Sequence, residues 1–298
     1  MTGLFIYLIK KMIQYAHLNG QLVAADAGSI KLNDLAILRG YGVFDFFLFY
    51  DGHPVFFDDY LDRYLHSAHL LHLNVPFDKE QLRAFVYQLI EANQQTNGAI
   101  RMIATGGYAP DGYAPVKPNI IMLQHPHPVY PETYYTDGVK LLSYRYEREI
   151  PRAKTINYLM GISALPALRA ANAIEVLYHD GQFIRETVRA NFYILTPGGK
   201  LVTPADKILL GNTRKAVLRI ARQFLPVEER EVAFEELKTA QEAFLSSSTR
   251  GIMPVVGVDD MVFGAGEPGP VTQKLMAGFE DVRQKYIAEQ KDLVTRQS

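Results

Sequence analysis

The chain has 298 residues, of which 48% are hydrophobic, and its formal net charge is −1. This length suffices for two α/β domains or one large domain, and the composition is that of a folded globular protein of enzyme size. The near-zero charge argues against a basic surface for nucleic acid. The absence of cysteine excludes disulfides, thiolate metal sites and cysteine nucleophiles. Because it is also compatible with a reducing compartment, we expect a cytoplasmic location.

Residues 1–11 contain a short apolar run, 4–9, which is followed by two lysines. The run is too short to span a bilayer, and its charges lie on the wrong side for a signal peptide. Met12 offers an alternative start. We therefore interpret residues 1–11 as an N-terminal extension and expect no membrane partner.

Residues 12–124 are expected to form a smaller α/β domain. Gly40 and Gly42 precede a run of aromatic and branched residues up to Tyr50, which is typical of a buried strand. Apolar residues at helical spacing predict two amphipathic helices. The expected elements are strands at 16–23, 99–105 and 119–124, turns at 19–20 and 51–52, and helices at 57–73 and 78–94.

Residues 125–137 are expected to be an interdomain linker. Three prolines fall within the eight residues 125–132, and proline at this density favours an extended connection. His125 and His127 raise the alternative of a metal-binding pair. Because prolines separate the two histidines, a solvated linker is favoured and no metal is expected.

Residues 138–298 are expected to form a larger α/β domain. Neither half of the chain alternates strand and helix strictly, so mixed sheets are predicted and not one doubly wound sheet. The expected elements are strands at 138–144, 174–178 and 252–256, a loop at 151–158 leading into a helix at 159–173, a turn at 180–181, a short helix between two strands within 231–245, and a terminal helix at 271–293.

One stretch, residues 183–214, combines an acid with a candidate anion site. Glu186 leads into an apolar strand ending near Ile194, a Pro-Gly-Gly turn at 197–199 reverses the chain, and a second short strand ends at Thr203. Gly211 and Asn212 then open a helix whose free N–H groups and positive dipole end suit a phosphate. This arrangement predicts a flat, charged cofactor held at both ends.

Lys154 lies in a largely neutral loop, and a loop lysine taken alone is usually solvated. Here it belongs to an ordered series of motifs that resembles the class IV, or fold type IV, pyridoxal-phosphate-dependent aminotransferases over about residues 16–285. Each motif alone would be weak. The series is Gly-x-Gly-Val-Phe-Asp (40–45), Leu-Asp-Arg-x-x-x-Ser-Ala (61–68), Lys-x-x-Asn-Tyr (154–158), Glu-x-x-x-x-Asn-Phe (186–192), Thr-Pro (203–204), Leu-x-Gly-x-Thr-Arg (209–214) and Ser-Ser-Ser-Thr-x-x-Ile-x-Pro-Val (246–255).

The resemblance implies an α+β fold of two domains, with mixed sheets and flanking helices, and a role for each motif residue. Lys154 would form a Schiff base with pyridoxal 5′-phosphate and move the substrate proton. Glu186 would keep the pyridine nitrogen protonated, which makes the ring an electron sink, and Tyr158 would hydrogen-bond the phenolic oxygen. The phosphate would be bound by Arg63, Asn212, Thr213, Ser248 and Thr249. The simpler alternatives are a surface arginine and polar loops.

A transaminase must also bind the carboxylate of its substrate, for which arginine is the natural residue. Arg101 is unusual in a strand otherwise fit for burial, Arg39 precedes the glycine pair, and Arg189 follows the motif acid by three residues. These three arginines and Phe44 are the candidate substrate-binding residues. The alternative for each arginine is a structural ion pair.

The motifs mix features of several subgroups of the family. Two residues separate Lys154 from Asn157, as in D-amino-acid transaminases and aminodeoxychorismate lyases, whereas Tyr158 resembles the branched-chain enzymes. Two positions depart from the usual pattern: Asp45 stands where glutamate is usual, and Tyr60 stands where a histidine commonly precedes the helix arginine.

We favour a transaminase that transfers an amino group between D-amino acids, such as D-glutamate and D-alanine, and a 2-keto acid such as 2-oxoglutarate. The alternatives are a branched-chain L-amino-acid transaminase, a 4-amino-4-deoxychorismate lyase, and a phosphate-ligand binding protein without catalysis. The presence of both Lys154 and Glu186 argues against the last. The resemblance also implies a homodimer in which the Gly40 loop or the 106–116 loop reaches the partner's site.

Overall fold

The structure, a computed structural model, describes residues 13–295, so the predicted extension at 1–11 lies outside the described residues. The described chain forms two compact units. Unit 1 extends to Pro128 and also contains Ala153–Asn157 and the C-terminal residues from Tyr286 onward, whereas unit 2 consists of Val129–Arg152 and Tyr158–Lys285. The segment with Lys154 thus groups with the N-terminal part of the chain, although it follows the predicted linker in sequence.

Unit 1 is built on a six-stranded sheet with the order β2-β1-β6-β5-β3-β4, in which every pair is antiparallel. The hairpin turns predicted at 19–20 and 51–52 are present, joining β1 to β2 and β3 to β4. The strands are β1 (Tyr15–Leu18), β2 (Gln21–Ala24), β3 (Gly42–Tyr50), β4 (His53–Pro54), β5 (Gly98–Thr105) and β6 (Ile120–His125).

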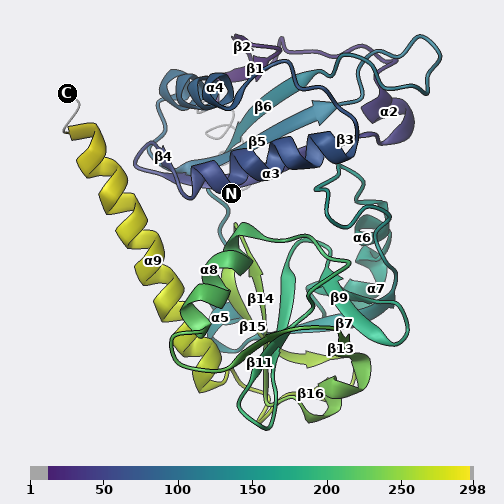
Figure 1. Cartoon of the computed structure of the whole chain (residues 1–298), viewed down its shortest axis with the longest axis vertical. Helices are drawn as coiled ribbons and strands as arrows, with labels where there is room; N and C mark the ends of the chain where they lie inside the picture. Colours follow the sequence, from purple (N-terminus) through teal and green to yellow (C-terminus); the bar gives the residue numbers. More distant parts are fainter. Residues whose placement is uncertain (1–12, 296–298) are drawn as a thin grey trace. The chain divides into compact units, whose positions relative to one another are not determined.

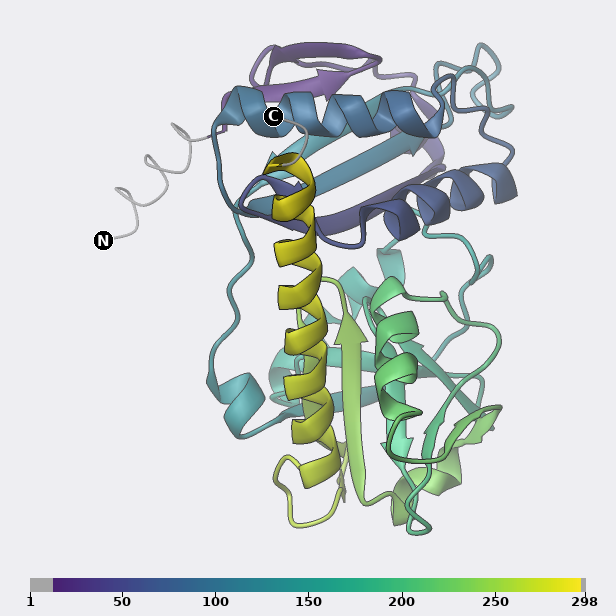
Figure 2. The same ribbon diagram turned by 60° about the vertical axis from the view of Figure 1, so that its left-hand side comes forward.

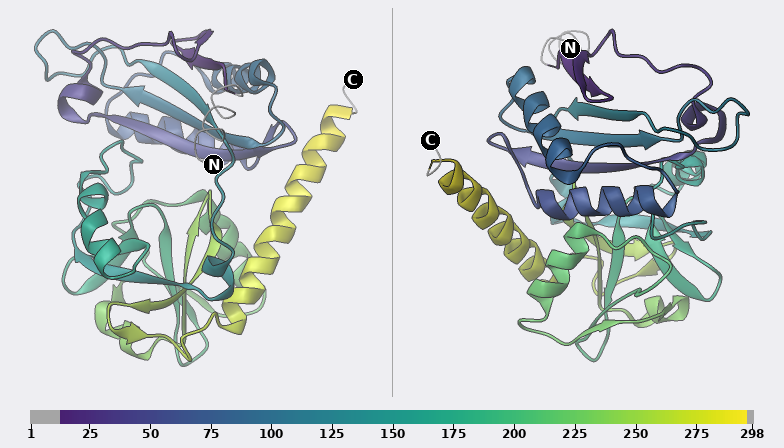
Figure 3. Two further views of the ribbon diagram at one scale, coloured as in Figure 1. Left: turned by 180° about the vertical axis from the view of Figure 1, so that it is seen from behind. Right: turned by 45° about the horizontal axis from the view of Figure 1, so that its top comes forward.

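Two helices, α3 (Phe57–Leu70) and α4 (Lys79–Asn93), pack on one face of this sheet (Figures 1 and 2). Their apolar stripes meet alternate residues of the strands, among them Phe47 and Met102, because successive strand side chains point to opposite faces. Figure 3 shows the strands of this sheet from behind and in a view with the top turned forward. The start of α4 is set by a capping box in which Asp78 and Gln81 bond each other's backbone N–H groups.

A shorter helix, α2 (Leu35–Arg39), precedes the longest strand of unit 1. It begins at Asp34, whose side chain accepts the N–H of Ala36, and it ends at Gly40 with a φ of 61°. A left-handed C-cap of this kind favours glycine because other residues meet a steric penalty there. The predicted backbone break at Gly40 is therefore a helix end.

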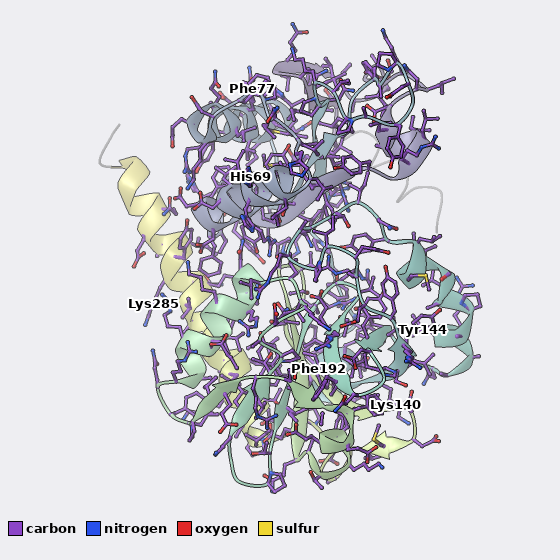
Figure 4. All side chains as sticks on the ribbon, turned by 45° about the vertical axis from the view of Figure 1, so that its right-hand side comes forward. His69, Phe77, Lys140, Tyr144, Phe192 and Lys285 are labelled. Carbon is purple, nitrogen blue, oxygen red and sulfur yellow. The ribbon has the colours of Figure 1, made fainter. Side chains whose placement is uncertain are left out.

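Unit 2 contains a ten-stranded sheet of mixed parallel and antiparallel pairs, with the order β12-β11-β10-β14-β15-β7-β8-β9-β13 and β16 paired to β15. Its core includes Phe192, which is labelled among the packed side chains in Figure 4. The strands are β7 (Val139–Arg145), β8 (Glu175–His179), β9 (Phe183–Thr187), β10 (Asn191–Leu195), β11 (Leu201–Thr203), β12 (Val227–Glu229), β13 (Val232–Ala233), β14 (Glu242–Ser247), β15 (Gly251–Val258) and β16 (Met261–Val262).

The helices of unit 2 differ from expectation at two places. The single helix predicted at 159–173 is two short helices, because Pro166 near the start of the second has no N–H to continue the first. The predicted linker contains a one-turn helix and begins with the last residue of β6. The helices are α5 (Thr133–Thr136), α6 (Leu159–Ser163), α7 (Leu165–Ala170), α8 (Asn212–Ala221), the 3₁₀ helix η1 (Phe234–Thr239) and α9 (Pro270–Thr295).

The single strand predicted from Glu186 to Ile194 is also divided in two. A tight turn separates β9 from β10: the N–H of Thr187 donates to the carbonyl of Ala190 (2.9 Å), and the N–H of Ala190 donates to the Thr187 hydroxyl (3.0 Å). The turn places Arg189 at its tip. The predicted Pro-Gly-Gly reversal joins β10 to β11.

Neither a metal site nor a membrane span is found in the described part of the chain. Within residues 13–295, no three His, Cys, Asp or Glu side chains group as metal ligands. His127 bonds the hydroxyl of Tyr50 (2.9 Å), and His125 packs on Phe46. No described helix is long and apolar enough to cross a bilayer.

Candidate active site

The backbone of Lys154 is fixed to the first residues of β3 in unit 1. The N–H of Phe44 donates to the carbonyl of Lys154 (2.9 Å), and the N–H of Ile156 donates to the carbonyl of Gly42 (3.0 Å). The N–H of Lys154 donates to the hydroxyl of Ser67 on α3 (3.1 Å). Because β5 pairs along the other edge of β3, residues 154–156 cover an edge that would otherwise expose unpaired backbone groups.

The side chain of Lys154 lies against the ring of Phe44, with its Nζ 4.6 Å from the ring centroid. The guanidinium of Arg101 lies 5.2 Å from the same centroid and 4.8 Å from that of Phe46. Arg101 is directly opposite Phe46 in the strand register, so its side chain belongs to the face that also carries Phe44. Three predicted site residues, Lys154, Phe44 and Arg101, are therefore neighbours within unit 1.

Arg63, the predicted phosphate arginine, is held by both residues that depart from the family pattern. Its Nε and Nη2 donate to the two oxygens of Asp45 (2.9 and 2.7 Å), and its guanidinium lies 5.3 Å from the ring centroid of Tyr60. Asp45 is fully buried and Arg63 is nearly so. A fork-to-fork contact of this kind fixes the plane of the guanidinium.

In unit 2, Glu186 is anchored on both sides of its carboxylate. Arg148 donates to Oε1 from Nε (2.9 Å) and Nη2 (2.7 Å), and the N–H of Leu209 donates to both oxygens (3.1 and 3.0 Å). The side chain is 6% exposed. A buried acid with charge-assisted bonds is held in one orientation, as an acid that pairs with a single ring nitrogen must be.

The hydroxyl of Tyr158 remains a hydrogen-bond donor throughout the neutral range. Burial raises the pKa of Tyr158 to about 12, against the opposing effect of Arg148. The charges of Glu175, Glu186 and Arg189 also act on this hydroxyl, which places the four side chains in one electrostatic neighbourhood. Three predicted site residues, Tyr158, Glu186 and Arg189, are thus grouped within unit 2.

The start of α8 has the features of an anion site. A Cβ on Gly211, the N-cap, would come within 2.3 Å of the Asn191 side-chain oxygen, so only glycine fits there. Asn191 pairs in register with Ser246, which precedes Ser247 on β14. Within residues 13–295 the buried Asn212 Nδ2 and Ser247 Oγ atoms lack hydrogen-bond partners. Buried polar atoms are normally satisfied, so these two are suited to a ligand's oxygens.

The remaining predicted residues are placed as follows. Ser248 and Thr249 form the turn between β14 and β15, and the Thr249 hydroxyl bonds the hydroxyl of Tyr130 (2.9 Å). Thr213 is buried in the first turn of α8. Arg39 is the last residue of α2, and the described contacts do not connect it with Lys154 or Phe44.

Arg148, Asp45 and Ser67 contact the predicted site residues but were missed as members of the site. Arg148 is 38 positions from Glu186, and no local spacing joins the two. Signals did exist for the others: Asp45 departs from the family pattern, and Ser67 lies one helical turn from Arg63.

Comparisons with known proteins find similar sequences and structures. A family described as "Amino-transferase class IV" matches residues 42–258. The D-alanine aminotransferase of Staphylococcus epidermidis is 28% identical over 277 residues, which cover 91% of this chain and 96% of the relative. A putative branched-chain-amino-acid aminotransferase of Methanocaldococcus jannaschii is 29% identical over 282 residues, with coverage of 91% and 96%. The branched-chain amino acid aminotransferase of Escherichia coli has a similar structure, with a TM-score of 0.83 and 25% identity over 91% of this chain and 95% of that one.

Proposed function

The chain belongs to the class IV aminotransferases, as its motifs predicted, and we propose that it transfers amino groups between D-amino acids and 2-keto acids with pyridoxal 5′-phosphate. The observation that carries the substrate side is the pairing of Lys154 and Arg101 on one aromatic ring in unit 1. It puts a candidate catalytic amine and a cation suited to a carboxylate against the same ring.

The residues present fit the cofactor. Asn212 and Ser247 supply buried polar atoms without partners, and the start of α8 supplies free N–H groups for the phosphate. The anchored carboxylate of Glu186 suits a protonated ring nitrogen, and the high pKa of Tyr158 suits a donor to the phenolic oxygen. In unit 2 we assign phosphate binding to Asn212, Thr213, Ser247, Ser248 and Thr249. The motif resemblance adds Arg63 of unit 1, whose guanidinium is bonded to Asp45.

When bound, the cofactor supplies an electron sink for charge that develops at the substrate Cα. Lys154 is the residue proposed to attach it covalently and to carry the proton from Cα. The backbone bonds of Lys154 fix where its side chain begins, and the Phe44 ring lies beside its amine. Glu186 would hold the ring-nitrogen proton in place, and Arg148 keeps that acid oriented.

The D-amino-acid preference is supported by the spacing of Lys154 and Asn157 and by the D-alanine aminotransferase among the relatives. Arg39, Arg101 and Arg189 are the candidate carboxylate ligands, with Arg101 favoured by its contact with Phe44. A site with positive charge in excess would accept dicarboxylates, which favours D-glutamate and 2-oxoglutarate as the substrate pair.

The test is a panel of half-reactions with purified holoenzyme and single D- or L-amino acids, followed through the visible absorbance of the cofactor. We expect D-glutamate and D-alanine to remove the visible absorbance of the lysine-bound cofactor fastest. Turnover of L-leucine or L-valine with none of D-alanine or D-glutamate would reject the D-specific proposal. Pyruvate release from aminodeoxychorismate without a keto acid would instead identify a lyase.

A branched-chain L-amino-acid transaminase is the second candidate. It is favoured by the Methanocaldococcus jannaschii relative and by the similarity to the Escherichia coli structure. Tyr158 also favours this candidate, because it resembles the branched-chain group. The half-reaction panel does, because the two candidates require opposite handedness at Cα.

We also propose that the chain acts as a cytoplasmic homodimer. In unit 1, α2 and the loop at 106–117 lie together, since the N–H of Leu35 donates to the carbonyl of Gly107 (3.0 Å). These segments expose Ile37, Leu38, Tyr113 and Val116, and Leu32, which precedes α2, is exposed as well. Grouped apolar side chains of this kind mark interaction surfaces. Light scattering that gives the mass of one chain at micromolar concentration would reject the dimer.

A further inference from the structure

Glu175, the first residue of β8, is a buried acid that no predicted motif includes. Its side chain is 1% exposed, and it bonds two arginines at once. Oε2 forms a short ion pair with Nη1 of Arg250, and Oε1 accepts from Nε of Arg189 at 3.3 Å. The two guanidinium groups carry one more positive charge than this carboxylate neutralises.

Arg250 is fixed and has the role of an anchor. Its side chain is 4% exposed, its guanidinium lies 5.6 Å from the ring centroid of Tyr130, and its carbonyl accepts the hydroxyl of Tyr135 (3.0 Å). Burial opposes ionisation of Glu175, but Arg250 and Arg189 outweigh it and lower the pKa of the carboxyl. Glu175 is therefore a fixed negative charge at neutral pH.

Arg189 is held at one end only. Its side chain is 55% exposed, and Glu175 is its single partner within residues 13–295. The bond uses Nε, so the two Nη groups that form the outer fork remain unpaired in the described part of the chain. A guanidinium fork of this kind matches the two oxygens of a carboxylate.

The turn that carries Arg189 is itself rigid and lies beside the proposed ring-binding residues. A Cβ on Gly161 would come within 2.4 Å of Val188, so α6 packs tightly against the turn. Arg189 and Glu175 both act on the hydroxyl of Tyr158. A purely structural ion pair would need only Glu175 and Arg250. Arg189 is a second, exposed arginine, and Glu175 is its only partner within residues 13–295.

We propose that Glu175 is a positioning residue: anchored by Arg250, it orients Arg189 so that the outer guanidinium fork receives a carboxylate of the substrate. The proposal rests on the proposed transaminase function and adds a residue that sets its substrate preference. Glu175 itself touches neither substrate nor cofactor. Its effect on binding is therefore exerted through Arg189 and disappears when Arg189 is absent.

The experiment is a double-mutant cycle of Glu175→Gln and Arg189→Gln in the holoenzyme. The probe is glutarate, a dicarboxylate that cannot react, and its dissociation constant is measured by calorimetry. A hydrogen bond to a charged group contributes about 1.5–3 kcal/mol, so we expect each single variant to weaken glutarate at least about tenfold. The double variant should bind no more weakly than Arg189→Gln alone. KM for the amino donor should rise with little change in kcat.

The matched control is Glu242→Gln, because Glu242 is also a buried acid of unit 2 but bonds the N–H groups at the start of α9. It should leave glutarate binding unchanged. If Glu175→Gln does not fold, Glu175→Gln/Arg250→Gln removes both buried charges and should weaken glutarate by the same factor. The positioning role would be overturned if Glu175→Gln weakened glutarate binding equally in the parent and in Arg189→Gln. Unchanged glutarate binding in Arg189→Gln would overturn it as well. Neither result bears on the transaminase assignment, which the half-reaction panel tests separately.

Discussion

Around Lys154 the described bonds hold the main chain and the amine lies against an aromatic ring, whereas around Glu186 they hold the carboxylate itself. Residues 154–156 are bonded to β3 and to Ser67 through main-chain groups, and the Nζ of Lys154 lies beside Phe44. Glu186 instead has both carboxylate oxygens bonded, by Arg148 and by the N–H of Leu209. A proton-carrying amine must move during a reaction, and an acid that holds a ring proton must not.

The strongest test of this difference between the two regions is to remove the amine of Lys154. Lys154→Ala should keep the fold, because the main-chain bonds of residue 154 remain, but should lower the transamination rate at least about 1,000-fold, since general acid–base catalysis alone contributes 10²–10⁴-fold. The rate is measured with the amino donor that the half-reaction panel selects. Lys207→Ala is the control, because Lys207 is an exposed lysine paired with Glu147. A Lys154→Ala enzyme that turns over at the parent rate would remove the basis of the mechanism.

The second test concerns the fixed acid. Glu186→Gln retains the shape and most hydrogen bonds but loses the charge that we propose holds the ring proton, so kcat should fall by about 100-fold, as for the loss of other preorganised electrostatic groups. The cofactor's visible spectrum reports whether binding survives. Glu242→Gln, which neutralises another buried acid of the same unit, should retain its kcat within a factor of about two, as expected for a residue outside the site. A similar loss in both variants would mean that Glu186 acts only through stability.

The same two regions show what the sequence could and could not provide. Lys154, Glu186 and the α8 start could be proposed from the sequence because each belongs to a local motif, and the strands and helices of unit 1 follow apolar spacing. The division of helix 159–173 had a visible cause in Pro166, but helical spacing on both sides masked it. Arg148 and Glu175 were missed because their partners, Glu186 and Arg250, are 38 and 75 positions away. Ion pairs between distant residues have no periodicity, so only the folded chain reveals them.

The third prediction tests whether unit 2 depends on its buried ion pairs for stability. The pKa of Glu175 is lower in the folded chain than in the unfolded chain. The ion pair therefore stabilises the fold fully at pH values above the ordinary pKa of glutamate, and this stabilisation is lost as the pH falls through the folded-state pKa. Glu175→Gln should lower the free energy of unfolding by about 3 kcal/mol at pH 7, the cost of breaking a buried pair. The difference in the free energy of unfolding between Glu175→Gln and the parent protein should become smaller below about pH 4.

Urea unfolding at pH 7 and at a lower pH measures this difference. The control is Glu235→Gln, which breaks an exposed pair with Lys238 and should cost less than about 0.5 kcal/mol at either pH. A loss from Glu175→Gln that does not change with pH would mean that packing of the side chain, and not its charge, stabilises unit 2.

The smallest change in kinetics is expected for Arg101, the cation that lies on the aromatic face of unit 1. Arg101→Met keeps a long side chain against Phe44 and Phe46 but removes the guanidinium, so KM for the keto acid should rise about tenfold, the loss of one charged hydrogen bond, with kcat little changed. Arg83→Met is the matched control, because Arg83 makes the same kind of contact with Phe57 at 5.0 Å in the same unit. It also pairs with Asp58, so its loss should affect stability and not KM. If Arg101→Met leaves KM unchanged while Arg189→Gln raises it, the carboxylate is bound by unit 2, and the aromatic contacts of Arg101 serve only to pack the sheet face.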